Sequence, residues 1–150
     1  HAAAYEINHL GKILLEDCKE PLYFKYMPHA VFTEPEIASV GITEQKAKEK
    51  NIKYITSTTN WLASAKAMST RLHYPVTKFL INPDNYEILG CHMIGPESST
   101  MMHQVLAVMH INNDVRHIKE MLYIHPALSE ALLPAAVAAV KEVEKYNKKS

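Results

Sequence analysis

The chain has 150 residues, the usual length of one domain, and 47% of them are hydrophobic, which is enough to build a core. Its 16 basic residues balance its 16 acidic ones, which excludes the broad positive field that attracts nucleic acid or an anionic membrane. No apolar run approaches the roughly 20 residues of a membrane span, and no secretory signal is present. The chain opens on His1 rather than on methionine, which favours a fragment of a longer protein. We expect a cytoplasmic location and no nucleic-acid or membrane partner.

The first segment is predicted to be a helix over residues 2–17, because apolar residues recur there at helical spacing. These residues are Ala3, Ile7, Leu10 and Leu14. Pro21 and Pro28 then break the regularity and mark a linker. From about Ala30 the composition becomes that of mixed strands and helices. We therefore divide the chain into a helix with its linker, residues 1–27, and a main domain, residues 28–150.

The main domain is expected to start with short extended pieces at Val31–Thr33 and Ser39–Gly41. Thr43 is placed to cap a polar helix that follows them. The β-branched run Lys53–Thr59 predicts a strand, and Ala63–Ser69 a short helix.

A β-hairpin is predicted in the middle of the chain. Two apolar runs, Val76–Ile81 and Ile88–Ile94, flank the turn-forming residues 82–85, which read Asn-Pro-Asp-Asn. Gly95-Pro96 ends the second strand.

Helices are predicted for the rest of the chain. The first covers Glu97–Ile111, and Asp114 caps a short one through Met121. Ser129 is expected to open the last helix, which reaches about Tyr146, with a kink or a restart at Pro134. Strands in one group, helices in another and a hairpin between them predict an α+β fold, an antiparallel sheet with helices packed on one face.

The usual cofactor and metal motifs are missing from the sequence. Its four glycines form neither a phosphate-binding loop nor a G-x-G-x-x-G fingerprint, so we expect no bound nucleotide in this chain alone. His103, His110 and His117 recur every two helical turns, or roughly 10.5 Å apart, too far to share one zinc ion. We expect no metal site. Cys18 and Cys91 are too few for a disulfide scaffold and are read as two reduced thiols.

The segment from His125 to Glu130 is a candidate acid–base site. Pro126 pushes His125 out of the helical region, so the backbone turns and can bring the carboxylate of Glu130 to the imidazole. A carboxylate bonded to one ring nitrogen fixes the tautomer and makes the other nitrogen more basic. The same pattern is also typical of a proline-started helix that follows a histidine by chance.

Four stretches resemble the dimerisation domain of the pyridine nucleotide–disulfide oxidoreductases, in the same order along the chain. They are residues 31–41, residues 43–47, the hairpin region from Lys78 to Pro96, and residues 125–130. Together they cover about residues 28–140. Residues 1–17 are similar to the last helix of the flavin domain of that family.

The resemblance implies a function and a site. His125 would be the acid–base group that exchanges protons with a substrate thiol, and Glu130 would orient it. The pair would act on the flavin and redox disulfide of the partner subunit, so a homodimer completes the site. The parent enzyme, with its own flavin and nucleotide domains, would use FAD and NAD(P), whereas this fragment would be inactive alone.

The resemblance also leaves alternatives open. The chain has Ala127 where the family usually has threonine, and Tyr123 where lipoamide dehydrogenases have histidine. His125 and a C-terminus without cysteine disfavour mercuric reductases. A dihydrolipoamide dehydrogenase-like parent is expected, with a glutathione reductase-like parent left open, as is the choice between NAD and NADP. A free-standing homodimeric module without a catalytic role is the alternative. We expect the dimer surface to come from the apolar faces of residues 101–109 and 128–143.

Overall fold

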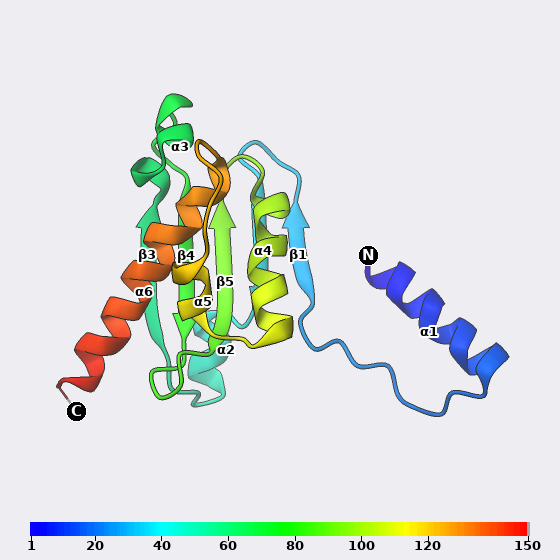
Figure 1. The fold of residues 1–150 in the computed structure, drawn as a ribbon. Coiled ribbons are helices and arrows are strands. Elements are labelled where there is room, and N and C mark those ends of the chain that lie inside the picture. Colours follow the sequence, from blue (N-terminus) through cyan, green and yellow to red (C-terminus); the bar gives the residue numbers. More distant parts are fainter. Residues whose placement is uncertain (150) are drawn as a thin grey trace.

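The structure is a computed structural model that describes residues 1–149. Five strands form one sheet in the order β1-β2-β5-β4-β3, and every neighbouring pair is antiparallel (Figure 1). The strands are β1 (Pro28–Val31), β2 (Ile37–Gly41), β3 (Ile55–Asn60), β4 (Val76–Ile81) and β5 (Ile88–Ile94). The predicted antiparallel sheet is confirmed.

The predicted hairpin is confirmed with the same strand bounds, because its turn chemistry fixes the register. The side chain of Asn82 accepts a hydrogen bond from the backbone N–H of Asp84, and the side chain of Asn85 accepts one from that of Glu87. These contacts reverse the chain between β4 and β5 and set Phe79 opposite Cys91.

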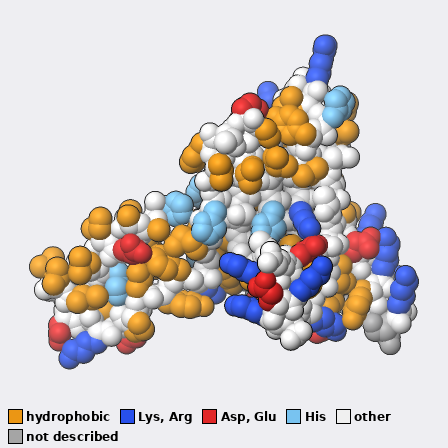
Figure 2. Space-filling model, turned by 180° about the vertical axis from the view of Figure 1, so that it is seen from behind, with side chains coloured by type: hydrophobic (Ala, Val, Ile, Leu, Met, Phe, Trp, Pro, Cys, Tyr) orange, Lys and Arg blue, Asp and Glu red, His pale blue; other side chains and the backbone are white. Residues whose placement is uncertain are grey.

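Three helices cover one face of the sheet: α4 (Ser98–Ile111), α5 (Val115–Glu120) and α6 (Leu132–Asn147) (Figure 1). The helix α4 packs on β1, β2 and β5, while α6 packs on β3 and β4. Shorter elements complete the domain: α2 (Glu44–Glu49), the 3-10 turn η1 (Trp61–Ala63), α3 (Ala65–Ser69) and the 3-10 turn η2 (Leu128–Ala131). The α+β prediction, with helices on one face, is therefore confirmed. Seen from behind, side chains of both charges are interspersed around α2 (Figure 2).

The core lies between the sheet and these helices, and it corrects the expected dimer surface. The inward residues of α4 and α6 are buried within the single chain; they include Met101, Val105, Met109, Leu132, Val140 and Val143. An amphipathic helix buries its apolar stripe against the nearest apolar surface, which here is the chain's own sheet. The buried residues of the 101–109 and 128–143 faces are thus used inside the domain, and the prediction that they supply the dimer surface is wrong for them, whereas Leu133 and Val137 of α6 stay partly exposed.

The first helix, α1 (Ala2–Glu16), forms as predicted but extends away from the sheet (Figure 1). All of its 15 residues are exposed or only partly covered, and they include Ile7, Leu10 and Leu14. Hydrophobic side chains are accordingly visible over this helix from behind (Figure 2). Within residues 1–149, no helix combines the length and the apolar character needed to cross a bilayer.

Several predicted boundaries differ from the structure: β2 begins at Ile37 rather than Ser39, and β3 covers Ile55–Asn60 rather than residues 53–59. The first strand is Pro28–Val31 rather than 31–33, because residues 28–31 pair with residues 37–40 of β2. Ser129 does not open the last helix: it lies inside η2, and α6 begins at Leu132. Pro134 falls in the first turn of α6, where a missing backbone N–H breaks no intrahelical bond. The restart, one of the two predicted alternatives, occurs just before this proline.

Candidate acid–base site

His125 and Glu130 contact each other at one end of the helical layer. Nδ1 of His125 lies 2.8 Å from Oε1 of Glu130, so the structure brings the two predicted residues together. The imidazole side chain is 68% exposed, whereas the carboxylate side chain is only 18% exposed. One partner is therefore held in place while the other stays open to an incoming molecule.

A short turn holds the Glu130 carboxylate. Its second oxygen, Oε2, accepts a hydrogen bond of 2.8 Å from the backbone N–H of Ala127. The carbonyl of Ala127 in turn accepts one of 3.3 Å from the backbone N–H of Glu130. The Ala127 N–H first, and the His125 ring second, hold the pKa of the Glu130 carboxyl below its ordinary value. The carboxylate is therefore ionised at neutral pH and has a fixed direction.

This direction determines what the imidazole can do. An ionised carboxylate only accepts hydrogen bonds, so Nδ1 of His125 must be the donor. In the neutral ring, Nε2 then carries the lone pair and can accept a proton. The arrangement is the base and its orienting partner of an acid–base site.

The segment leading to His125 alternates between inward and outward side chains. Met121 and Tyr123 pack against the core, while Leu122 and Ile124 are exposed to solvent. The phenol of Tyr123 donates a 2.8 Å hydrogen bond to the carbonyl of Ile118, and burial raises the pKa of Tyr123 to about 12. Tyr123 thus stays protonated and ties the segment to the end of α5.

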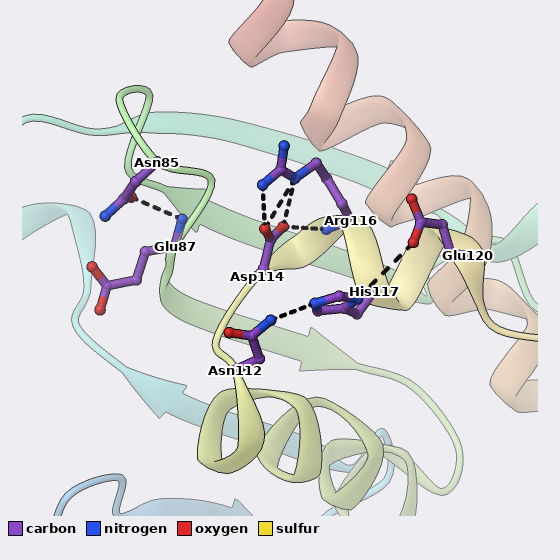
Figure 3. A network of polar contacts seen from close by, with 7 residues as sticks. All are labelled: Asn85, Glu87, Asn112, Asp114, Arg116, His117 and Glu120. Atoms are coloured by element: carbon purple, nitrogen blue, oxygen red, sulfur yellow. Dashed lines mark hydrogen bonds and ion pairs between the residues drawn. The ribbon is translucent and has the colours of Figure 1, made fainter.

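A polar network fixes the other end of α5 (Figure 3). The Asp114 carboxylate accepts a 2.8 Å hydrogen bond from the backbone N–H of Arg116 and also pairs with its guanidinium group. Burial acts to raise the pKa of Asp114, but the hydrogen bonds from Arg116 outweigh it, so the pKa lies below its ordinary value. Asp114 therefore caps α5 as predicted, and the helix gives the segment before His125 a rigid start.

Ser64 also contacts the site, and the sequence did not predict it. Its hydroxyl donates a 3.2 Å hydrogen bond to the carbonyl of Ala127, although the two residues are 63 positions apart. The sequence offered only a local signal, a serine near the start of a short predicted helix. The contact depends on how η1 and η2 pack together, and the local sequence pattern around Ser64 cannot indicate such packing.

Two of the three regularly spaced histidines, His110 and His117, have separate partners. His110 Nδ1 lies 2.9 Å from the carbonyl of Leu106, while His117 Nε2 lies 2.7 Å from the side-chain nitrogen of Asn112. Within residues 1–149, no three His, Cys, Asp or Glu side chains come close enough together to hold a metal ion.

The sequence matches that of a known family and of individual enzymes. A family model described as the dimerisation domain of the pyridine nucleotide-disulphide oxidoreductases matches residues 27–136. The mitochondrial dihydrolipoyl dehydrogenase of Schizosaccharomyces pombe is 33% identical over 116 residues, which are 77% of this chain and 23% of that protein. The chloroplastic dihydrolipoyl dehydrogenase 2 of Arabidopsis thaliana is 34% identical over 110 residues, which are 71% of this chain and 19% of that protein. The chain thus spans about a quarter of the length of the curated relatives it matches.

Solved structures share the fold. The HOCl-induced flavoprotein disulfide reductase RclA of Escherichia coli superimposes with a TM-score of 0.77 at 24% identity, over 85% of this chain and 30% of that one. LpdA of Mycobacterium tuberculosis gives a TM-score of 0.73 at 20% identity, over 84% of this chain and 28% of that one. With the family match over most of its length, the chain belongs to the pyridine nucleotide–disulfide oxidoreductases and contains their dimerisation domain, with dihydrolipoyl dehydrogenases among its relatives.

Proposed function

We propose that this domain supplies His125, oriented by Glu130, as the acid–base group of a homodimeric flavin-dependent disulfide oxidoreductase, and that it acts on the redox disulfide of the partner subunit. The observation that carries the proposal is the 2.8 Å contact between Nδ1 of His125 and Oε1 of Glu130, which leaves Nε2 of an exposed ring as the basic atom. The relatives named dihydrolipoyl dehydrogenase favour a dithiol, such as a dihydrolipoyl group, as the substrate.

The proposed step is a proton transfer coupled to thiol–disulfide exchange. Nε2 of His125 takes the proton from a substrate thiol, and the imidazolium that forms is stabilised by the Glu130 carboxylate. The resulting thiolate attacks one sulfur of the partner's redox disulfide. A new S–S bond forms as the old one breaks, and the second sulfur leaves as a thiolate. In the reverse direction, the imidazolium returns its proton to the substrate thiolate.

The cofactors belong to the rest of the parent chain in this proposal. When bound there, FAD and NAD(P) would carry the electron pair away from or toward the cysteine pair. This domain does not fit either cofactor by itself, because its sheet is antiparallel throughout. A dinucleotide fold instead places the phosphates at a loop between a parallel strand and a helix. Residues 1–27, in which the helix α1 has no buried residue, would be the end of the flavin domain, and residues 28–150 the dimerisation domain.

The dimer surface is proposed to lie next to His125. Because the inward faces of α4 and α6 are used in the core, the exposed apolar side chains nearest to the site in sequence are Leu122 and Ile124. A second copy that covered these residues would exclude water beside the imidazole and could bring its own disulfide to Nε2.

The test is rapid-mixing kinetics on the full-length flavoprotein that carries this domain. His125→Ala should slow the disulfide half-reaction roughly 10²–10⁴-fold, the typical effect of a positioned acid–base group. Reduction of the flavin by the nicotinamide should stay nearly unchanged. Glu130→Gln should slow the disulfide step less, because the imidazole remains but loses its charged partner. An unchanged disulfide step in His125→Ala would reject the proposal and favour an interaction module without a catalytic role.

A cytoplasmic location is part of the proposal and has its own check. The relatives include proteins named as mitochondrial and chloroplastic, so organelles are the competing locations. Fractionation of source cells with an antibody against this domain would distinguish them.

A further inference from the structure

We infer that Ser64 is a positioning residue for the acid–base pair, because its hydroxyl fixes the turn that holds Glu130 against His125. The inference rests on the proposed function and adds to it a residue from a distant part of the chain. Ser64 does not contact His125; it acts through Ala127.

Ser64 is held rigidly by the core. Its side chain is buried, at 2% exposure, directly after η1. The first residue of η1, Trp61, is 1% exposed and donates its indole N–H to Oγ1 of Thr77 at 2.8 Å. The Ser64 hydroxyl also accepts a 3.4 Å hydrogen bond from the backbone N–H of Ala67, which caps α3. The hydroxyl thus accepts from Ala67 and donates its proton to the carbonyl of Ala127.

Three hydrogen bonds connect this hydroxyl to the imidazole. Ser64 Oγ donates to the carbonyl of Ala127 at 3.2 Å, the N–H of Ala127 donates to Glu130 Oε2 at 2.8 Å, and Glu130 Oε1 meets His125 Nδ1 at 2.8 Å. The last two contacts lie within the turn at residues 125–130 and cannot by themselves fix the turn relative to the sheet. Ser64 supplies a fixed point outside the turn, since it reaches the turn from the end of η1, 63 positions away in the sequence.

Loss of the Ser64 hydroxyl should therefore loosen the carboxylate without removing it. Ala127 would keep its N–H but lose a hydrogen bond to its carbonyl, so Glu130 would face the imidazole for a smaller share of the time. The imidazolium would be less stabilised and would give up its proton more easily. The pH midpoint of the disulfide half-reaction should move to lower pH, and its maximal rate should fall.

The experiment uses the full-length flavoprotein with Ser64→Ala, and Ser69→Ala as the matched control. Ser69 is the last residue of α3, the helix that Ser64 caps, but its hydroxyl is exposed and donates a hydrogen bond to the carbonyl of Lys66. Rapid mixing over a range of pH gives the disulfide step, and flavin reduction by the nicotinamide reports on the rest of the enzyme. We expect Ser64→Ala to slow the disulfide step about three- to tenfold, the usual effect of one hydrogen bond, and to lower its pH midpoint. Flavin reduction, and both steps in Ser69→Ala, should be unchanged.

A double variant separates positioning from a general loss of structure. In a Glu130→Gln background the carboxylate charge is already gone, so Ser64→Ala should cause no further shift of the pH midpoint. If the shift persists there, or if Ser64→Ala alone leaves rate and midpoint unchanged, the inference is wrong. If instead His125→Ala leaves the disulfide step intact, the proposed function itself fails. Should Ser64→Ala not bind flavin, Ser64→Cys, a near-isosteric weak donor, must still lower the midpoint while flavin reduction stays normal.

Discussion

The carboxylate of Glu36 accepts a hydrogen bond from the backbone N–H of Ser99, so a residue next to β2 caps the start of α4. The backbone carbonyl of Glu36 also accepts one from Gly95 at 2.9 Å. The first N–H groups of a helix have no partner within it, and a remote carboxylate serves here in place of a local cap.

Replacing Glu36 by alanine should lower the free energy of unfolding by about 1 kcal/mol, the usual worth of a helix cap. Urea denaturation measures the change. Glu97→Ala is the control, since Glu97 is an exposed carboxylate at the same helix start. Equal losses in the two variants would mean that the negative charge matters and the hydrogen bond does not.

Thr77→Val should destabilise the domain by roughly 1–3 kcal/mol, because it leaves a buried indole N–H without a partner. Trp61 donates to Thr77 at 2.8 Å, and both side chains are almost completely buried. Trp61 is the single tryptophan of the chain, so its fluorescence follows the unfolding directly. Thr77→Ser keeps the hydroxyl and should retain most of the stability; a Thr77→Val variant as stable as the wild type would contradict the account.

The domain should lose stability as the pH falls below about 6.5, in part through His92. Burial first, and then Lys78 nearby, lower the pKa of His92 below its ordinary 6.5, while the backbone contact to Ile42 and the charge of Glu44 work the other way. Below pH 6.5 the imidazole of His92 becomes protonated in the unfolded chain but stays neutral in the folded chain. The free energy of unfolding therefore falls with pH until the lowered pKa of the folded state is reached.

Comparison of urea denaturation at pH 7.5 and pH 5.5 gives the size of this effect. His92→Gln should reduce the loss of stability between the two pH values, whereas His73→Gln, at an exposed histidine, should leave it as in the wild type. An identical pH dependence in His92→Gln and the wild type would rule out His92 as a source of it.

Leu122→Lys combined with Ile124→Lys should weaken self-association of the full-length protein by more than about tenfold. Both side chains are exposed in the single chain and lie in the segment that leads to His125. A charged group buried in an apolar interface without a partner costs several kcal/mol. Sedimentation equilibrium measures the dissociation constant, and Met68→Lys, at a residue that is 57% exposed on α3, is the control. Unchanged dimers in the double variant would place the interface elsewhere.

Local patterns predicted most of the fold. The strands Val76–Ile81 and Ile88–Ile94 were predicted to the residue, because apolar runs and the turn residues between them act over a few positions. Thr43 and Asp114 cap their helices as predicted for the same reason. The contact between His125 and Glu130 could also be predicted from the sequence, because Pro126 turns the backbone between them and brings the carboxylate toward the imidazole.

Tertiary packing decided what the sequence could not. An apolar helix face has the same sequence pattern whether it packs on the chain's own sheet or on a second copy. In the structure the inward faces of α4 and α6 pack on the sheet. Ser129 has the side chain of a typical helix cap, but it lies inside the 3-10 turn η2. There the side chain of Glu130, not that of Ser129, accepts the hydrogen bond from the N–H of Ala127. Ser64 and Glu36 each act on a residue 63 positions away, beyond any local pattern.

Ala127 takes part in the site through its backbone alone, with its N–H on Glu130 and its carbonyl on Ser64. Its side chain is therefore free of the chemistry, and the backbone there is extended, with φ −138° and ψ 154°, a conformation open to most residues. The threonine that is usual in the family and the alanine found here should therefore orient the carboxylate equally well. Proline alone is barred, because it would remove the N–H that orients the carboxylate. For a protein engineer, position 127 is a place to attach a probe two residues from His125 while the hydrogen bonds of the backbone to Glu130 and Ser64 stay intact.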